Sequence, residues 1–224
     1  MSLSASFHRI TGILLVLLQA CIIHALSAQD KPEKFQKEVD QIVSNTPVPS
    51  GDIYLFTGSS SVRMWKDINR FFPDVTVVNT GFGGSQTFEL LHYADDLIIR
   101  YAPHKVFIYE GDNDLASGKT PVTILNTMQK LVGKLQAALP ETEIVLISPK
   151  PSPSRWQLRE EYESLNRLLK VYAEKTSGVA FVNVWDIALN EEGRPKPEIF
   201  LSDSLHMTKL GYEGWAEMLE PHIP

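Results

Sequence analysis

The feature that most constrains this chain is a regular alternation of short apolar runs with longer amphipathic segments. Five short runs rich in β-branched residues predict strands, at 53–56, 75–78, 105–109, 143–147 and 179–184. The segments between them repeat apolar residues every three or four positions, which predicts helices at 122–139 and 158–173, with a final helix at 208–219. Strands that alternate with helices form a parallel sheet with helices on both faces, so we expect an α/β fold.

The first 28 residues have the pattern of a secretory signal peptide. Arg9 precedes an uncharged apolar stretch at 10–26, and the small residues Ser27 and Ala28 follow it, so cleavage after either predicts a secreted or periplasmic protein without stable membrane insertion. Two alternatives stay open. Leu18-Gln19-Ala20-Cys21 is similar to a lipoprotein box that would anchor the chain through Cys21, and the apolar stretch could also remain as an uncleaved anchor.

Composition bounds the remaining chain. Removing 28 of 224 residues leaves 196, enough for one domain, which we place at 51–224 behind an N-terminal helix and linker at 29–50. The chain has 21 Lys and Arg against 27 Asp and Glu, a formal net charge of −6, so no nucleic-acid partner is expected. Cys21 is the one cysteine, so the domain has no disulfide framework or thiolate metal site. The sequence does not indicate an oligomeric state.

Polar clusters lie where the predicted strands end. Residues 58–61 follow the first strand, 79–85 the second and 111–114 the third, while 203–206 come from the connection after the fifth. The carboxyl ends of parallel strands share one edge of the sheet, and ligands bind at that edge. We therefore expect the four clusters to meet in one crevice.

Two of the clusters have the content of a nucleophile and its base. Asp203 precedes His206 by three residues, a spacing at which a carboxylate can orient an imidazole that accepts a proton. The serines of Gly58-Ser59-Ser60-Ser61 offer a nucleophile. Taken singly, each motif also fits a helix start or a polar turn. His92 and Asp95 have the same spacing, but they fall inside a helix predicted at 89–100 rather than at a strand end.

The other two clusters offer hydrogen-bond donors for a developing oxyanion. Gly84 can present a backbone N–H and Asn113 a side-chain N–H. Each also has an ordinary interpretation, a flexible turn for the glycines at 81–84 and a turn former for Asn113. A dinucleotide loop is excluded because Gln86 stands where a third glycine is needed. Gly-x-Ser-x-Gly is absent because Val62 occupies its last position.

With these residues identified, the chain resembles the GDSL-type esterase and lipase superfamily, the SGNH hydrolases, in a branch with a Gly-Ser-Ser-Ser first block. Residues 56–61, 77–85, 111–114 and 203–206 match its four blocks in order, and the resemblance extends over roughly 50–220. It implies a flavodoxin-like three-layer α/β/α sandwich with a five-stranded parallel sheet in the order 2-1-3-4-5.

The resemblance also implies roles for single residues. It makes Ser60 the nucleophile, His206 the base and Asp203 its orienting carboxylate. Gly84, Asn113 and the backbone N–H of Ser60 match the oxyanion hole. No metal or organic cofactor is implied. Ser59 stands where the family often has Asp, a departure that concerns the geometry of the loop more than the reaction.

The expected reaction is two-step hydrolysis of short-chain, acetyl-like esters, including esters on carbohydrates, through an acyl-serine. The segments 112–121 and 149–156 are short and supply no apolar lid for a long acyl chain. Arg155 and Trp156 could bind a sugar or polar alcohol, or serve only as a surface charge and a loop anchor. The alternatives are a lysophospholipase or lipase-like acylhydrolase and an inactive carbohydrate-binding module.

Overall fold

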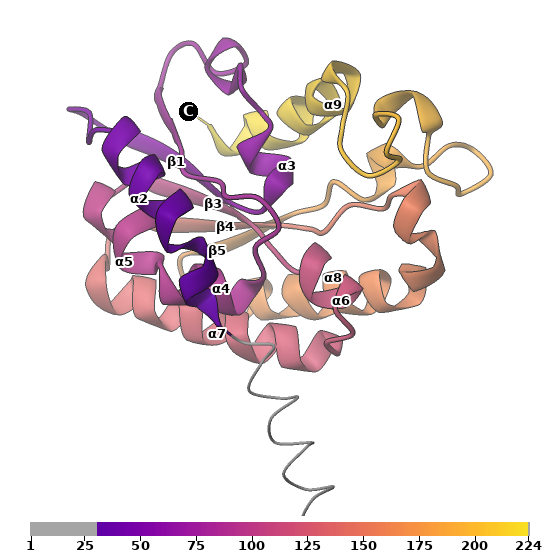
Figure 1. Cartoon of the computed structure of the whole chain (residues 1–224), viewed down its shortest axis with the longest axis horizontal. Helices are drawn as coiled ribbons and strands as arrows, with labels where there is room; N and C mark the ends of the chain where they lie inside the picture. The colour runs from indigo at the N-terminus through magenta and orange to yellow at the C-terminus, as the bar shows by residue number, and fades with distance from the viewer. Residues whose placement is uncertain (1–30, 224) are drawn as a thin grey trace, which may run out of the picture. The chain divides into compact units, whose positions relative to one another are not determined.

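A five-stranded parallel sheet forms the centre of the computed structural model, which describes residues 31–223 (Figure 1). The strand order is β2-β1-β3-β4-β5, and every neighbouring pair is parallel. The strands are β1 (Ile53–Gly58), β2 (Thr76–Asn79), β3 (Lys105–Tyr109), β4 (Glu143–Ile147) and β5 (Val179–Val182). The α/β class and the order 2-1-3-4-5 are thereby confirmed. The fifth strand ends two residues before its predicted end, where the N–H of Val184 binds the Ser148 hydroxyl at 2.9 Å.

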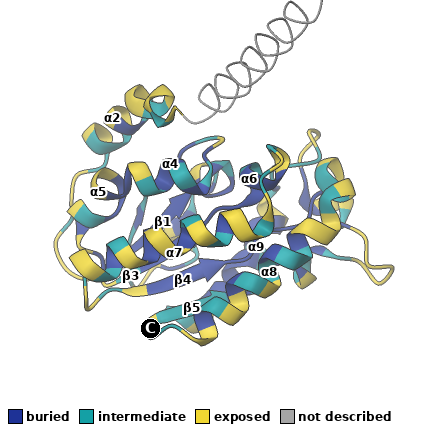
Figure 2. Cartoon of the chain, turned by 90° about the horizontal axis from the view of Figure 1, so that it is seen from below, coloured by how far each residue is buried: buried dark blue, intermediate teal, exposed yellow. Residues whose placement is uncertain are grey.

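Helices cover both faces of the sheet. On one face lie α3 (Ser60–Arg63) and α9 (Lys209–Leu219), and on the other α4 (Thr87–His92), α5 (Ala94–Leu97), α7 (Pro121–Ala138) and α8 (Arg159–Glu174) (Figures 1 and 2). Two further helices are α2 (Gln36–Asn45) and α6 (Asp112–Ala116). A compact unit begins at Lys37, and residues before it, with the 3-10 turn Pro32–Phe35, belong to a separate unit.

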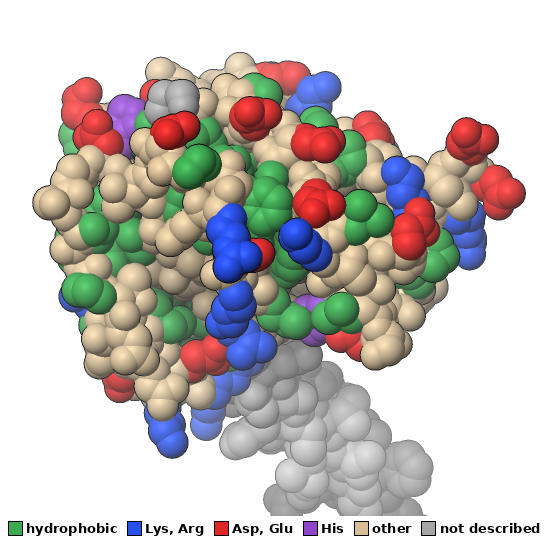
Figure 3. All heavy atoms as spheres, turned by 90° about the horizontal axis from the view of Figure 1, so that it is seen from above, with side chains coloured by type: hydrophobic (Ala, Val, Ile, Leu, Met, Phe, Trp, Pro, Cys, Tyr) green, Lys and Arg blue, Asp and Glu red, His purple; other side chains and the backbone are tan. Residues whose placement is uncertain are grey.

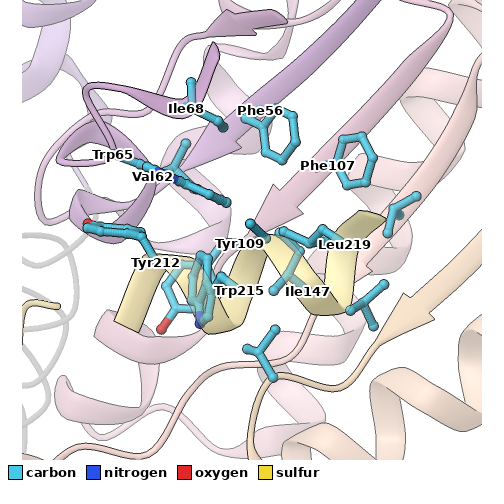
Figure 4. Close-up of a cluster of buried hydrophobic side chains, with 14 of the residues drawn as sticks. Phe56, Val62, Trp65, Ile68, Phe107, Tyr109, Ile147, Tyr212, Trp215 and Leu219 are labelled. Atoms are coloured by element: carbon cyan, nitrogen blue, oxygen red, sulfur yellow. The ribbon is translucent and has the colours of Figure 1, made fainter. Parts of the chain in front are cut away.

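Aromatic side chains fill the space between the sheet and α9 (Figure 4). The rings of Phe56 on β1 and Phe107 on β3 stack at 4.3 Å, because alternate residues of a strand point to the same face. Trp65 stacks on Tyr212 of α9 at 5.2 Å, and Trp215 lies 4.9 Å from Tyr109. This packing fixes the start of α9, and the loop that precedes it, relative to the ends of β1 and β3.

Apolar spacing predicted the buried face of α7 correctly and that of α9 only in part. It did not predict the breaks in the segment 89–100. All five α7 residues at the predicted spacing are buried: Ile124, Met128, Leu131, Val132 and Leu135. On α9, the apolar spacing predicts that Leu210, Trp215 and Leu219 face the core, but Leu210 is 51% exposed and Tyr212 is buried. The helix predicted at 89–100 is broken into α4, α5 and a 3-10 turn, since Tyr93 and Ile98 have a non-helical backbone.

The proposed signal peptide and Cys21 lie outside the described residues. No helix within residues 31–223 is both long enough and apolar enough to cross a lipid bilayer.

Candidate active site

The turn from β1 into α3 exposes one serine and buries its two neighbours. Gly58 has a φ of +119°, and a Cβ there would lie 2.0 Å from the carbonyl oxygen of Tyr109, so the turn requires glycine. Ser59 is 1% exposed and Ser61 2%, whereas Ser60, the first residue of α3, is partly exposed. Of the three hydroxyls in the cluster, only that of Ser60 is open to a substrate.

The loop at 203–206 is shaped by the carboxylate of Asp203. Its Oδ1 accepts hydrogen bonds from the backbone N–H groups of Leu205 and His206, both at 2.9 Å. Its Oδ2 lies 2.6 Å from Nδ1 of His206. An antiparallel bridge between Phe200 and Met207 closes the loop. The same carboxylate thus folds the loop and fixes the orientation of the imidazole.

His206 joins this loop to the serine. Its Nε2 lies 3.0 Å from Oγ of Ser60, across 146 positions of sequence, so Asp203, His206 and Ser60 form one hydrogen-bonded chain. Hydrogen bonds, first of all from the His206 imidazole, lower the pKa of Asp203 to about 2. His92 and Asp95, the competing pair, make other contacts. Asp95 binds Lys134 at 2.7 Å, and His92 packs edge-on against the Tyr93 ring.

The two predicted oxyanion donors lie in segments that hydrogen bonds connect to the serine turn. The N–H of Phe82 binds the carbonyl oxygen of Gly58 at 2.8 Å, which holds the glycine loop against the end of β1. Gly84 in that loop is exposed and has a φ of +79°, where a side chain would be strained. Nδ2 of Asn113 donates to the carbonyl oxygen of Ser85 at 2.8 Å. A primary amide has two N–H groups, so Asn113 keeps a second one for a ligand.

A residue that the sequence analysis missed supports the glycine loop from α2. Oε1 of Glu38 accepts a hydrogen bond from the N–H of Gly83 at 3.0 Å and lies 3.8 Å from Nη1 of Arg63. The Arg63 guanidinium also occupies the space that a Cβ on Gly83 would need. Glu38 lies 45 positions before its partner, and no motif or spacing in the sequence points to this contact.

Arg155 and Trp156 lie near the site but in different surroundings. Nη1 of Arg155 pairs with Oδ1 of Asp112, and Nη2 donates to Oδ1 of Asn113 at 3.0 Å. Trp156 stacks on Trp185 at 6.1 Å, with the Arg194 guanidinium 5.1 Å from its ring. A role for Arg155 and Trp156 in substrate binding stays a prediction.

Two clefts lie beside the segments that carry the proposed site residues. Trp156 lines one of about 360 Å³, together with Pro153, Leu201 and Ser204 of the loop that carries His206. A larger cleft of about 590 Å³ lies between α2 and the edge strand β2, and Arg63 and Trp65 are its lining residues nearest in sequence to Ser60.

A buried charged cluster behind Asn113 was also missed. The Asp112 carboxylate accepts hydrogen bonds from Tyr162 and Arg155 on Oδ1 and from Tyr109 on Oδ2, while Nζ of Lys150 lies 3.9 Å from Oδ2. Burial alone would raise the pKa of Asp112, but Lys150 and Arg155 hold it below its usual range. The available signal was Lys150 itself, a charge between two prolines immediately after the fourth strand.

Two acidic side chains are buried beneath the glycine loop. Glu110 accepts a hydrogen bond from the Ser85 hydroxyl at 2.6 Å, and burial, with a contribution from nearby Asp114, raises its pKa well above the usual range. Burial likewise raises the pKa of Asp114 to about 6, although Asp114 accepts the N–H of Thr87 at 2.9 Å. Within residues 31–223, no three His, Cys, Asp or Glu side chains are grouped so that they could hold a metal ion.

The model of the GDSL-like Lipase/Acylhydrolase family matches residues 51–213. No curated protein matches the chain.

Among solved structures, a Streptococcus pneumonia protein described provisionally as a platelet activating factor is 25% identical, with a TM-score of 0.76 over 92% of this chain and 99% of that one. A GDSL-like lipase from Bacteroides thetaiotaomicron is 19% identical, with a TM-score of 0.71 over 86% of this chain and 97% of that one. A catalytic variant of Axe2, an acetylxylan esterase from Geobacillus stearothermophilus, is 19% identical, with a TM-score of 0.64 over 79% of this chain and 95% of that one.

Proposed function

Because the chain belongs to the GDSL-like lipase/acylhydrolase family, we propose that it hydrolyses short-chain, acetyl-like esters through an acyl intermediate on Ser60. It is an ester-hydrolysing serine hydrolase. The observation that carries the assignment of Ser60 is the hydrogen-bonded chain in which His206 lies 3.0 Å from the one accessible hydroxyl of the cluster at 59–61 and 2.6 Å from Asp203.

In the first step, Oγ of Ser60 attacks the ester carbonyl carbon and its proton moves to Nε2 of His206. The Asp203 carboxylate stabilises the imidazolium that forms. The negative charge on the carbonyl oxygen is stabilised by the N–H groups of Ser60 and Gly84 and by the second N–H of Asn113. As the first residue of a helix, Ser60 has no intrahelical acceptor for its own N–H.

Collapse of this intermediate breaks the bond to the alcohol oxygen, which takes the proton from His206 and leaves as the free alcohol. Water then gives a proton to His206 and attacks the acyl-serine. The carboxylic acid departs and Ser60 regains its proton. Since His206 protonates the leaving alcohol, that group lies on the histidine side of Ser60, where the cleft lined by Trp156 and Ser204 borders the same loop.

The surface supports short acyl groups over lipids. Among the described residues, the exposed large apolar side chains come from separate elements: Val48, Val122, Val171, Leu201 and Leu210. On the face shown in Figure 3, apolar side chains are interrupted by charged and polar ones. The acetylxylan esterase with a similar fold supports a carbohydrate ester as the substrate, and the signal-like pattern of residues 1–28 supports secretion.

The test is a panel of 4-nitrophenyl acetate, butyrate and octanoate with an acetylated xylo-oligosaccharide, given to the wild type and to Ser60→Ala. We expect turnover of acetyl esters that is lost in Ser60→Ala. A preference for octanoate would instead indicate the lipase-like alternative. Absence of turnover with retained binding of the oligosaccharide would indicate a carbohydrate-binding module.

A further inference from the structure

The buried carboxylate of Asp112 is the centre of a cluster that touches both halves of the site without containing any of the reacting groups. Its two oxygens contact Arg155, Tyr162, Tyr109 and Lys150. Lys150 is 1% exposed and Asp112 4%. Removing charges from water is costly, and such clusters often stabilise a protein no better than apolar residues would. The cluster therefore calls for an explanation other than stability.

One arm of the cluster holds the amide of Asn113 from both sides. Nη2 of Arg155 donates to Oδ1 of Asn113 at 3.0 Å, while Nδ2 of Asn113 donates one hydrogen to the carbonyl oxygen of Ser85 at 2.8 Å. An amide rotated by 180° would place its NH₂ group against the guanidinium and its oxygen against the Ser85 carbonyl. Arg155 thus selects the orientation that leaves one Nδ2 hydrogen for the oxyanion.

The other arm reaches the loop that carries the base. Nζ of Lys150 donates a hydrogen bond to the carbonyl oxygen of Leu205 at 2.8 Å. Leu205 lies next to His206, and its own N–H binds Asp203 at 2.9 Å. The ammonium group is also close enough to Asp203 for the two charges to interact. Lys150 follows β4, so this arm ties the loop to the rigid sheet.

We propose that Asp112, Lys150 and Arg155 are positioning residues that hold the Asn113 amide and the Asp203–His206 loop in register with each other. The inference rests on the proposed function, because it assigns the cluster to the same site. Asp112 pairs with both cations, so the two arms share one anchor. The two Nη atoms of the Arg155 guanidinium bind Asp112 and Asn113 at the same time. A single ammonium group cannot bind both in that geometry.

The principal variant is Arg155→Lys, which keeps the charge next to Asp112 and loses the bond to Asn113. With 4-nitrophenyl acetate we expect kcat about tenfold lower and KM within about twofold of wild type, since a displaced donor costs less than the 10²–10³ of a lost one. In an Asn113→Ala background, Arg155→Lys should change kcat by less than about twofold, because its effect passes through that amide. Arg167→Lys, at an exposed position on α8, is the matched control and should behave as wild type.

The second arm is tested with Lys150→Met. It should lower kcat about tenfold in the wild-type and the Asn113→Ala backgrounds alike, because it acts on the histidine loop. Thermal melts of the same samples separate these effects from unfolding. If Lys150→Met does not fold, Arg155→Lys still decides the proposal. For Arg155→Lys, a wild-type kcat or an equal loss in the wild-type and Asn113→Ala backgrounds would overturn the proposal, and so would a wild-type kcat in a folded Lys150→Met.

A measurement that does not depend on turnover distinguishes the proposed role of the cluster from the proposed function. The side-chain N–H signals of Asn113, identified by their loss in Asn113→Ala, should move towards random-coil positions in Arg155→Lys. Unchanged signals would refute the cluster's role. Absence of Ser60-dependent turnover in the wild type would refute the proposed function, while the amide signals would still test the cluster.

Discussion

Burial distinguishes three consecutive serines whose hydroxyl groups are chemically equivalent. Ser59 and Ser61 are enclosed between the sheet and α3, and the Ser59 hydroxyl has no hydrogen-bond partner among the described residues. Ser60 faces His206 because the turn after Gly58 starts α3 at that residue. The chemistry of hydroxyl groups cannot choose among the three, so the choice depends on backbone geometry.

This difference predicts where a covalent probe reacts. A fluorophosphonate should form an adduct on Ser60, since His206 can take the proton of that hydroxyl alone. Peptide mapping by mass spectrometry locates the adduct. Ser60→Ala should abolish labelling, and Ser59→Ala should leave both labelling and melting temperature near wild type, because its buried hydroxyl makes no bond to lose. An adduct on Ser59 or Ser61 would contradict the proposed nucleophile.

The low pKa of Asp203 predicts the shape of the pH profile. With a pKa of about 2, this carboxylate stays ionised throughout the usable range, so its own titration should not appear in the pH profile of kcat/KM. Asp203→Asn keeps an oxygen for the two backbone N–H groups but removes the charge beside the imidazolium. We expect kcat to fall by about 10²–10⁴. An inflection that disappears in Asp203→Asn and leaves the rest of the profile unchanged would contradict this assignment.

At the scale of elements, periodicity predicted which strands and helices form better than it predicted where a helix ends. The five strands and the long helices were predicted because burial on one or both faces leaves a period in the sequence. The helix expected at 89–100 is broken at Tyr93, whose side chain is buried against Phe82. Such a break follows from a tertiary contact and leaves no local signal.

The acidic residues beneath the glycine loop predict a dependence of stability on pH. Glu110 has a folded-state pKa raised well above the unfolded value of about 4.3, so the folded protein binds more protons than the unfolded chain between these two values. Its contribution to stability is therefore lost as the pH rises through this window. Glu110→Gln keeps the shape and the bond to Ser85 without the charge. We expect a melting temperature near wild type at pH 4 and above wild type at pH 8.

The exposed Glu141→Gln is the control for this comparison and should show no such difference. A Glu110→Gln variant that melts near wild type at pH 4 but below wild type at pH 8 would mean that the charge at Glu110 stabilises the fold.

For the whole molecule, the structure brings together the residues that the sequence proposed as reacting groups, whereas the residues that support them were not predicted. Ser60, Gly84, Asn113 and the 203–206 loop follow strand ends, and topology brings strand ends together. The supports act across long separations, 45 positions from Glu38 to Gly83 and 55 from Lys150 to Leu205. Spacing within an element cannot indicate such pairs, because each partner looks like an ordinary surface charge until the chain is folded.

Long-range contacts of this kind predict that the domain needs α2 in order to work, although the matched family region begins at residue 51. Val39 of α2 is buried, and the Tyr101 hydroxyl donates to the carbonyl oxygen of Thr46 at 2.9 Å. Burying a Val side chain contributes about 1.5–3 kcal/mol, and a hydrogen bond about 0.5–1.5 kcal/mol. A chain that starts at residue 51 should therefore melt about 5–15 °C below one that starts at residue 31.

Activity separates the two roles of α2. In the chain that starts at residue 31, Glu38→Ala removes the acceptor for Gly83 while leaving Val39 and Thr46 in place. Its melting temperature should stay within a few degrees of the parent, while kcat falls about tenfold, because the loop that presents Gly84 loses its support. Glu33→Ala, in the separate unit before Lys37, is the matched control and should change neither quantity. Parent-like kcat in Glu38→Ala would limit α2 to a role in stability, since the loop would then hold its shape through its other hydrogen bonds, among them that from Phe82 to Gly58.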